Sequence, residues 1–117
     1  NNIGIVYLEI GNYEAALKYF YSALKQEEAE GSHADASYTT ANIGRTYQYM
    51  EDYQNAVTYL SEAVIIMKRS GDIQAESQAY SNLGKTFMKM KKFDEAKKNM
   101  PKPLKSFVTL HASIHNL

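Results

Sequence analysis

The feature that most constrains this chain is an internal repeat. When the 117-residue sequence is aligned on itself with an offset of forty residues, similar residues coincide in three successive stretches. A fixed period of this size is typical of stacked supersecondary units, in which each unit packs on its neighbours. The best-matched sets are Asn2, Asn42 and Asn82; Ile3, Ile43 and Leu83; Gly4, Gly44 and Gly84; Tyr7, Tyr47 and Phe87; Tyr13, Tyr53 and Phe93; and Ala16, Ala56 and Ala96.

Within each period the apolar residues predict helices. In the first period Ile3, Tyr7 and Ile10 lie three or four residues apart, and the same spacing continues from Tyr13 through Phe20. This spacing gathers side chains on one face of a helix, whereas a strand would show alternation. We therefore expect helices at about residues 1–10, 13–30, 33–50, 53–70, 73–90 and from 93 onward.

Residues at the expected helix ends support these boundaries. A side-chain oxygen just before a helix can accept a hydrogen bond from a free amide of the first turn. A glycine just after a helix can take the left-handed conformation that ends it. The expected caps at helix starts are Asn12, Ser32, Asp52 and Asp72, and the expected stops are Gly31 and Gly71.

Glycine recurs once per period inside an expected helix, at Gly4, Gly44 and Gly84. A glycine in a helix interior costs roughly 1 kcal/mol relative to alanine. Three such costs at one register predict a close approach of the neighbouring helix, and we expect the partners to be the stretches around Ala16, Ala56 and Ala96. A helix pair of this kind cannot bury its apolar face alone, so the sequence predicts a stack of helix pairs.

The end of the chain departs from the repeat. Pro101 and Pro103 fall inside the expected last helix, where a proline costs about 3 kcal/mol or more. The helix either kinks there or ends near Asn99 and restarts at Pro103, so that the apolar residues of 104–117 could cover the end of the stack. The first unit lacks counterparts of residues 35–41, which indicates either a fragment of a longer repeat protein or an end that pairs with another copy.

The repeated residues resemble a known family. Residues Tyr80–Phe87, followed by Ala96 and Met100, are similar to the tetratricopeptide pattern W-x2-L-G-x2-Y, A-x3-F. Two further copies are Thr40–Tyr47 with Ala56 and Leu60, and Ile3-Gly4 with Tyr7, Ala16 and Phe20. The repeat is longer than the usual thirty-four residues and in this respect is similar to Pins-type polarity adaptors, kinesin light chains and the Rap-type and other signalling proteins of bacteria.

The resemblance implies an all-α, right-handed solenoid of about three repeats that binds peptides or proteins and carries no catalytic residues or cofactor. Its first repeat would span about 1–31, its second about 32–71 and its third about 72–100, with a kinked or capping helix at 101–117.

Composition excludes several other classes of function. The 13 basic and 13 acidic residues balance, and the chain has no Cys and no apolar run long enough to cross a bilayer. We expect a soluble, cytoplasmic protein that binds neither nucleic acid nor membrane. His111 and His115 have a metal-like spacing but no third ligand nearby, so we expect no metal site. The charge run Glu27, Glu28 and Glu30 is interpreted as a solvated helix face.

The candidate binding residues lie on the first helix of each unit, which lines the concave groove in the family that the chain resembles. Asparagine side chains carry donors and an acceptor that can pair with the backbone of an extended peptide. Arginine and lysine on the same face favour an acidic or carboxylate-bearing ligand. The predicted groove residues are Asn2, Asn42, Arg45, Tyr49, Asn82, Lys85 and Lys89.

Two other roles remain open at this point. The exposed repeat ends could drive formation of a homo-oligomer, with an incidental groove. The chain could also be the sensory or regulatory segment of a bacterial signalling protein, which is compatible with either role.

Overall fold

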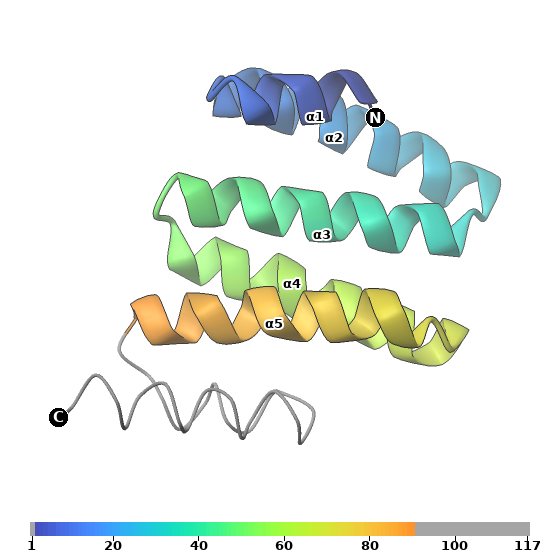
Figure 1. Ribbon diagram of the computed structural model, residues 1–117. Helices are drawn as coiled ribbons and strands as arrows, with labels where there is room; N and C mark the ends of the chain where they lie inside the picture. The colour runs from blue at the N-terminus through green and yellow to red at the C-terminus, as the bar shows by residue number, and fades with distance from the viewer. Residues whose placement is uncertain (1, 91–117) are drawn as a thin grey trace, which may run out of the picture.

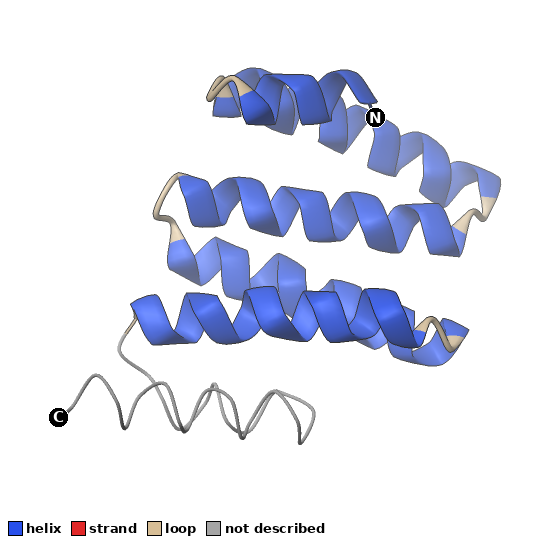
Figure 2. Cartoon of the chain, in the orientation of Figure 1, coloured by secondary structure: helices blue, strands red, loops and turns tan. Residues whose placement is uncertain are grey.

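The computed structural model describes residues 2–90, and these residues form five α-helices without a strand (Figures 1 and 2). This confirms the all-α fold class. Each expected helix within the described residues is present, and the boundaries agree to within one residue. The helices are α1 (Asn2–Glu9), α2 (Tyr13–Glu30), α3 (His33–Tyr49), α4 (Tyr53–Ser70) and α5 (Ile73–Lys89).

The helix ends form largely as the sequence predicts. Asn12 accepts a hydrogen bond from the Ala15 amide at 3.2 Å, and Asp52 and Asp72 make the equivalent bonds at the starts of α4 and α5. Gly31 and Gly71 end α2 and α4 with φ of 71° and 77°, the left-handed conformation expected of them. The prediction for Ser32 is wrong, since its side chain makes no capping hydrogen bond to α3.

The helices form two layers (Figure 1). Helices α1, α3 and α5 run side by side along one face of the stack, and α2 and α4 lie behind them. Helix α3 packs against α2 and α4, α5 packs against α4 and α3, and α1 packs against α2. The front layer therefore presents one continuous surface that is built from the first helix of each pair.

The helical glycines lie at close contacts between the two layers. A Cβ atom built on Gly44 would lie 2.7 Å from Cγ of Leu60, and one on Gly4 would lie 2.7 Å from the ring of Phe20. Both glycines are buried, as is Gly84. The expected close approach is confirmed for Gly4 and Gly44, but its partners are Phe20 and Leu60, one helical turn beyond the alanines that we expected.

The core of the stack follows the repeat register. Ile43, Leu60 and Leu83 are buried at equivalent or facing positions, together with Phe20 and Phe87. Each lies on the face of its helix that meets the other layer, which is the face the apolar spacing predicts. The alanines at the repeat register are also fully buried at Ala16 and Ala56.

Tyrosines connect successive helices outside this core. The rings of Tyr47 on α3 and Tyr59 on α4 stack at 5.6 Å, and the Tyr21 hydroxyl on α2 bonds both of their hydroxyls at 2.8 and 2.9 Å. The surrounding rings desolvate the Tyr21 hydroxyl, and together with these hydrogen bonds they raise the pKa of Tyr21 above its usual value. Tyr7, Tyr13 and Tyr47, which fall at repeated positions of the sequence, are partly buried against the cluster of Leu8, Ala16, Phe20 and Ile43.

One surface prediction needs correction. Glu28 and Glu30 are exposed, but Glu27 is only partly exposed, and its Oε1 atom is buried without a hydrogen-bond partner among the described residues. The position explains this, because one period later the same site is the buried Met67. The predictions for the packing partner of Ala96, for Phe93, for the helix break at Pro101–Pro103 and for His111 and His115 lie outside the described residues.

Candidate functional site

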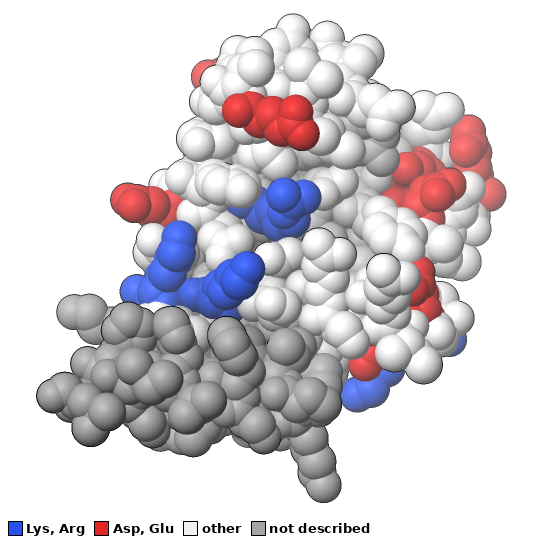
Figure 3. All heavy atoms as spheres, in the orientation of Figure 1, with Lys and Arg blue, Asp and Glu red and all other residues white. Residues whose placement is uncertain are grey.

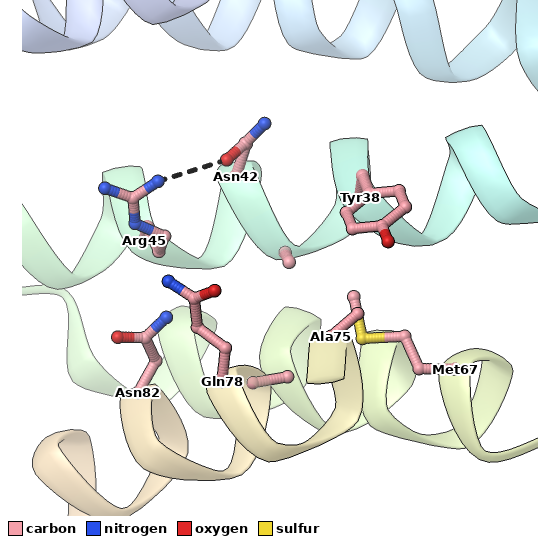
Figure 4. Close-up of a pocket in the computed structure, with 9 residues that line it drawn as sticks. Tyr38, Asn42, Arg45, Met67, Ala75, Gln78 and Asn82 are labelled. Carbon is pink, nitrogen blue, oxygen red and sulfur yellow. Dashed lines mark hydrogen bonds between the residues drawn. The ribbon is translucent and has the colours of Figure 1, made fainter. Parts of the chain in front are cut away.

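A hollow between α3 and α5 lies on the front face of the stack (Figure 4). It has a volume of about 110 Å³. Its floor is apolar and consists of Ala41 on α3, Met67 on α4, and Ala75 and Ala79 on α5. Its polar margin consists of Tyr38, Asn42, Arg45, Gln78 and Asn82. The hollow therefore combines a small apolar base with hydrogen-bonding groups around it.

A second, wider hollow of about 510 Å³ continues from the first along the same two helices. The two share Arg45, Gln78 and Asn82, so together they form one groove, which we call the α3–α5 groove. The second hollow adds Tyr49 and Gln48 from α3, and Lys85, Met88 and Lys89 from α5.

The two asparagines of this groove are arranged differently. Asn42 accepts a hydrogen bond from Nη1 of Arg45 at 3.3 Å, and its side chain is turned away from α5. Gln78 and Asn82 extend from α5 toward α3, and neither side chain has a hydrogen-bond partner within residues 2–90 (Figure 4). The groove therefore presents two carboxamides from α5 that have no partner among residues 2–90, while Asn42 positions Arg45.

Threonines fix the backbone beneath these asparagines. The Thr46 hydroxyl donates to the Asn42 carbonyl oxygen at 2.7 Å, and the Thr86 hydroxyl donates to the Asn82 carbonyl oxygen at 2.9 Å. Both threonines are fully buried. The same side-chain to backbone hydrogen bond therefore forms at Asn42 in α3 and at Asn82 in α5, one period apart.

Basic side chains gather along the groove. Lys85 and Lys89 are exposed, and neither has a hydrogen bond or an ion pair within the described part of the chain. Figure 3 shows basic side chains over α3 and α5 on this face and acidic side chains over α1 and at the far ends of the helices. The groove therefore offers positive charge that no acidic side chain of residues 2–90 neutralises by direct contact.

A third hollow, of about 350 Å³, lies between α1 and α3 and shares Arg45 and Tyr49 with the groove. Its other residues are Ile5, Leu8, Glu9 and Tyr13. The rings of Tyr13 and Tyr49 stack there at a centroid distance of 6.2 Å. We call this the α1 pocket.

Tyr38 connects the groove margin to the start of α5. Its hydroxyl donates to the carboxylate of Asp72, the residue that caps α5. The hydrogen bond from Tyr38, with a second one from the Ala75 amide, lowers the pKa of Asp72. The same hydrogen bond, aided by desolvation and the negative charge of Asp72, raises the pKa of Tyr38.

The structure brings six of the seven predicted site residues together in the α3–α5 groove: Asn42, Arg45, Tyr49, Asn82, Lys85 and Lys89. Asn2 is exposed on α1 and lines none of the three hollows. Sequence reasoning missed Tyr38 and Gln78, although each lies four residues before a predicted asparagine and so on the same helical face.

The described part of the chain offers neither a metal site nor a membrane-spanning helix. No group of three or more His, Asp or Glu side chains there is placed to hold a metal ion. None of the described helices is both long enough and apolar enough to cross a membrane.

Comparison with protein families identifies the repeat. The model of a family described as tetratricopeptide repeat matches the chain twice, over residues 1–69 and over residues 35–100. The two overlapping matches cover most of the sequence and include all five described helices. A search of curated proteins found no match.

Proposed function

The chain belongs to the tetratricopeptide repeat family, and from this premise we propose that it binds an extended peptide segment of a partner protein in the α3–α5 groove. Repeats of this family generally mediate protein–protein interactions and are generally not enzymes. The proposal rests on the juxtaposition in one groove of an apolar hollow, three cationic side chains and two carboxamides that are unpaired within the described residues.

The carboxamides supply the backbone part of this recognition. An extended peptide leaves its amides and carbonyls unpaired, and a carboxamide can donate to one and accept from the other. Gln78 and Asn82 stand on one face of α5, four residues apart, and both extend toward α3. They can therefore contact two successive parts of one peptide, while an aliphatic side chain of that peptide enters the hollow over Met67 and Ala79.

The cations supply the preference for acidic ligands. Arg45, Lys85 and Lys89 line the wider part of the groove, and the two lysines have no partner among the described residues. A ligand carboxylate would gain charge-assisted hydrogen bonds there without displacing an existing ion pair. We therefore propose an acidic partner segment; a cytoplasmic setting and a role in signalling remain predictions.

A titration tests this proposal. The probe is a fluorescein-labelled peptide with one leucine followed by two glutamates in an otherwise alanine and serine sequence, measured by fluorescence anisotropy. We expect Lys85→Glu to weaken binding several-fold at low salt, and the loss to shrink as salt is raised. Asn82→Ala removes hydrogen bonds to the peptide and should weaken binding by about 1–2 kcal/mol at any salt concentration.

Lys18→Glu is the matched control, because Lys18 is an exposed residue of α2 that lines none of the three hollows. It makes the same charge change as Lys85→Glu and should leave the affinity unchanged. Equal binding by the wild type, Lys85→Glu and Asn82→Ala would reject the groove as the binding site.

Self-association is a second candidate function, and one observation favours it. Ile3 and Val6 on α1 and Ile10 just after its end are 54%, 55% and 69% exposed, although Ile43 and Thr46, the counterparts of Ile3 and Val6, are fully buried. An apolar face that is covered inside the stack is therefore open on α1. Light scattering over a range of concentrations tests this role: a mass that stays at one chain throughout excludes it, and dimerisation that is lost in Val6→Glu supports it.

A further inference from the structure

We propose that the ligand of this groove is bipolar: beside its acidic residues it carries a basic residue, which the α1 pocket receives. This inference rests on the proposed function, since it concerns a second subsite for the same peptide. It specifies a charge pattern that a purely acidic ligand would not have.

The α1 pocket has the components that recognise a cationic side chain. Glu9 is among its lining residues, and so are Tyr13 and Tyr49, whose rings stack on each other. Tyr49 is 56% exposed, so part of its ring surface is available to a ligand although Tyr13 stacks on it. An aromatic face beside a carboxylate attracts an arginine or lysine through both the ring quadrupole and charge pairing.

The order of charges along the front face gives the ligand its pattern. Glu9 lies on α1, Arg45 on α3, and Lys85 and Lys89 on α5. Figure 3 shows this order on one face, with acidic side chains over α1 and basic side chains over α3 and α5. A peptide that crosses all three helices thus meets a negative subsite at one end and a positive subsite at the other.

Arg45 borders the α1 pocket and keeps its positive charge, so a ligand carboxylate that pairs with its guanidinium has to offset the repulsion of the ligand's basic residue. The Nη1 atom of Arg45 donates to Asn42 on its own helix. Arg45 lines both the α1 pocket and the groove, so its charge separates the two subsites. A ligand carboxylate would lie between Arg45 and Lys85, and the ligand's basic residue would lie on the other side of Arg45. Positive and negative groups would then alternate across the front face of the stack.

The helix layer sets the separation of the two charges. Helices in direct contact lie about 8–10 Å apart, and α1 makes little direct contact with α3, so this spacing is the least that separates neighbouring helices of the front layer. The α1 pocket lies between α1 and α3 while Lys85 lies on α5. The two subsites are then at least roughly 12 Å apart, a distance that an extended peptide spans in about four residues at roughly 3.3 Å each. The proposed ligand therefore has a basic residue about four positions from its acidic pair.

A charge-swap titration tests the inference. The probes are labelled peptides with one arginine about four residues from a glutamate pair, made in both chain directions, and matched peptides in which the arginine is glutamine or glutamate. In at least one direction, the arginine peptide should bind the wild-type chain about fivefold more tightly than the glutamine peptide, a factor within the range of a cation–π contact and an exposed ion pair.

Variants then assign the effect to the α1 pocket. In Glu9→Lys the arginine peptide should lose its advantage and the peptide with glutamate at that position should bind best. Tyr49→Leu keeps an apolar side chain but removes the ring, and should reduce the advantage of arginine. Glu14→Lys makes the same charge change at an exposed position of α2 that lines none of the three hollows, and should leave the order of affinities as in the wild type.

The outcomes separate this inference from the proposed function. If the arginine and glutamine peptides bind equally in both directions, or if Glu9→Lys leaves their order unchanged, the basic subsite is wrong. The groove itself still stands in that case, provided that Lys85→Glu weakens all of the peptides. Absence of binding by every peptide, or binding that is insensitive to Lys85→Glu, overturns both. Circular dichroism of each variant checks that its helices are retained.

Discussion

Replacing Gly44 by alanine tests how the groove helix α3 is held in the stack. In an exposed helix this change would stabilise the protein by roughly 1 kcal/mol, because alanine is the better helix former. Here the new methyl group would lie 2.7 Å from Cγ, 3.0 Å from Cδ2 and 3.1 Å from the backbone nitrogen of Leu60. The side-chain atoms could turn aside, but the nitrogen belongs to the backbone of α4 and can move only with that helix.

The size of the effect follows from these two opposing contributions. Inserting a methyl group into a packed core costs about 1–3 kcal/mol, and the fixed nitrogen places Gly44→Ala toward the upper end of that range. After the gain in helix propensity of roughly 1 kcal/mol is subtracted, we expect the free energy of unfolding to fall by about 1–2 kcal/mol. For a domain of this size that corresponds to a drop in melting temperature of roughly 5–10 °C.

The assay is thermal and urea unfolding followed by circular dichroism at the helix band. Gly4→Ala is the comparison, because its methyl group meets the ring of Phe20, at 2.7 and 2.8 Å, and no backbone atom is among its three nearest neighbours. Within the described residues, α1 has substantial contact with α2 only, so it can shift more freely than α3. We therefore expect Gly4→Ala to lower the free energy of unfolding less than Gly44→Ala does. A Gly44→Ala variant that melts at or above the wild-type temperature would refute the argument that close packing requires glycine.

Three further predictions concern single positions. Glu51 has a positive φ of 62°, so Glu51→Gly should raise the free energy of unfolding by up to about 1 kcal/mol in urea titrations, whereas Glu51→Ala should give no such gain. Glu27→Met places the side chain of the equivalent Met67 where a carboxylate oxygen is buried without a partner; it should be about 1 kcal/mol more stable than Glu27→Gln in the same assay. Because its hydrogen bond with Tyr38 lowers the pKa of Asp72, the stability that this bond adds is present above the ordinary aspartate pKa of about 3.9 and lost as the pH falls through the lowered value. The wild type should therefore exceed Tyr38→Phe in melting temperature at pH 7, and the difference should shrink as the pH is lowered toward 2; a difference that persists unchanged in acid would contradict this.

The fold could be predicted closely because its signals are local and repeated. The caps Asn12 and Asp52 and the stops Gly31 and Gly71 set the ends of α2 and α4, and each signal occurs at the same register in two units. Their hydrogen bonds are made within a few residues of chain, so they need no knowledge of tertiary contacts. The period then specifies which helix packs on which.

What the sequence did not predict depends on contacts between units or on backbone conformation. The partners of Gly4 and Gly44 are Phe20 and Leu60. The repeat indicates which helix packs against each glycine. It does not indicate which turn of that helix makes the contact, because this depends on the relative axial position of the two helices. The positive φ of Glu51 was missed because glutamate gives no sign of it, although the counterpart Gly11, with φ of 84°, does.

The site was predictable in its position but not in its shape. The residues of α3 and α5 that lie at one register do line one groove, since equivalent helices are parallel neighbours in the stack. The hollow over Met67 could not be predicted, because its floor comes from α3, α4 and α5 together. Asn2 has the same register as the other asparagines but does not line the pocket between α1 and α3, which is the one equivalent helix beside α1 within the described residues.

The residues that hold the stack and those that line the groove alternate along the same helix. On α3, Ile43, Gly44 and Thr46 are buried and fix the helix, while Arg45 and Tyr49 face the groove. A change at Arg45 therefore alters what the groove binds and leaves the contacts between helices in place, whereas a change at Gly44 moves the whole helix and every groove residue on it. On α5, Gly84 and Thr86 are buried beside the groove residue Lys85, so the same division is made one period later. Because groove and packing positions are separate in both units, the charges along the groove can change without a change in the fold, and the identities at these few positions would set the ligand that we propose.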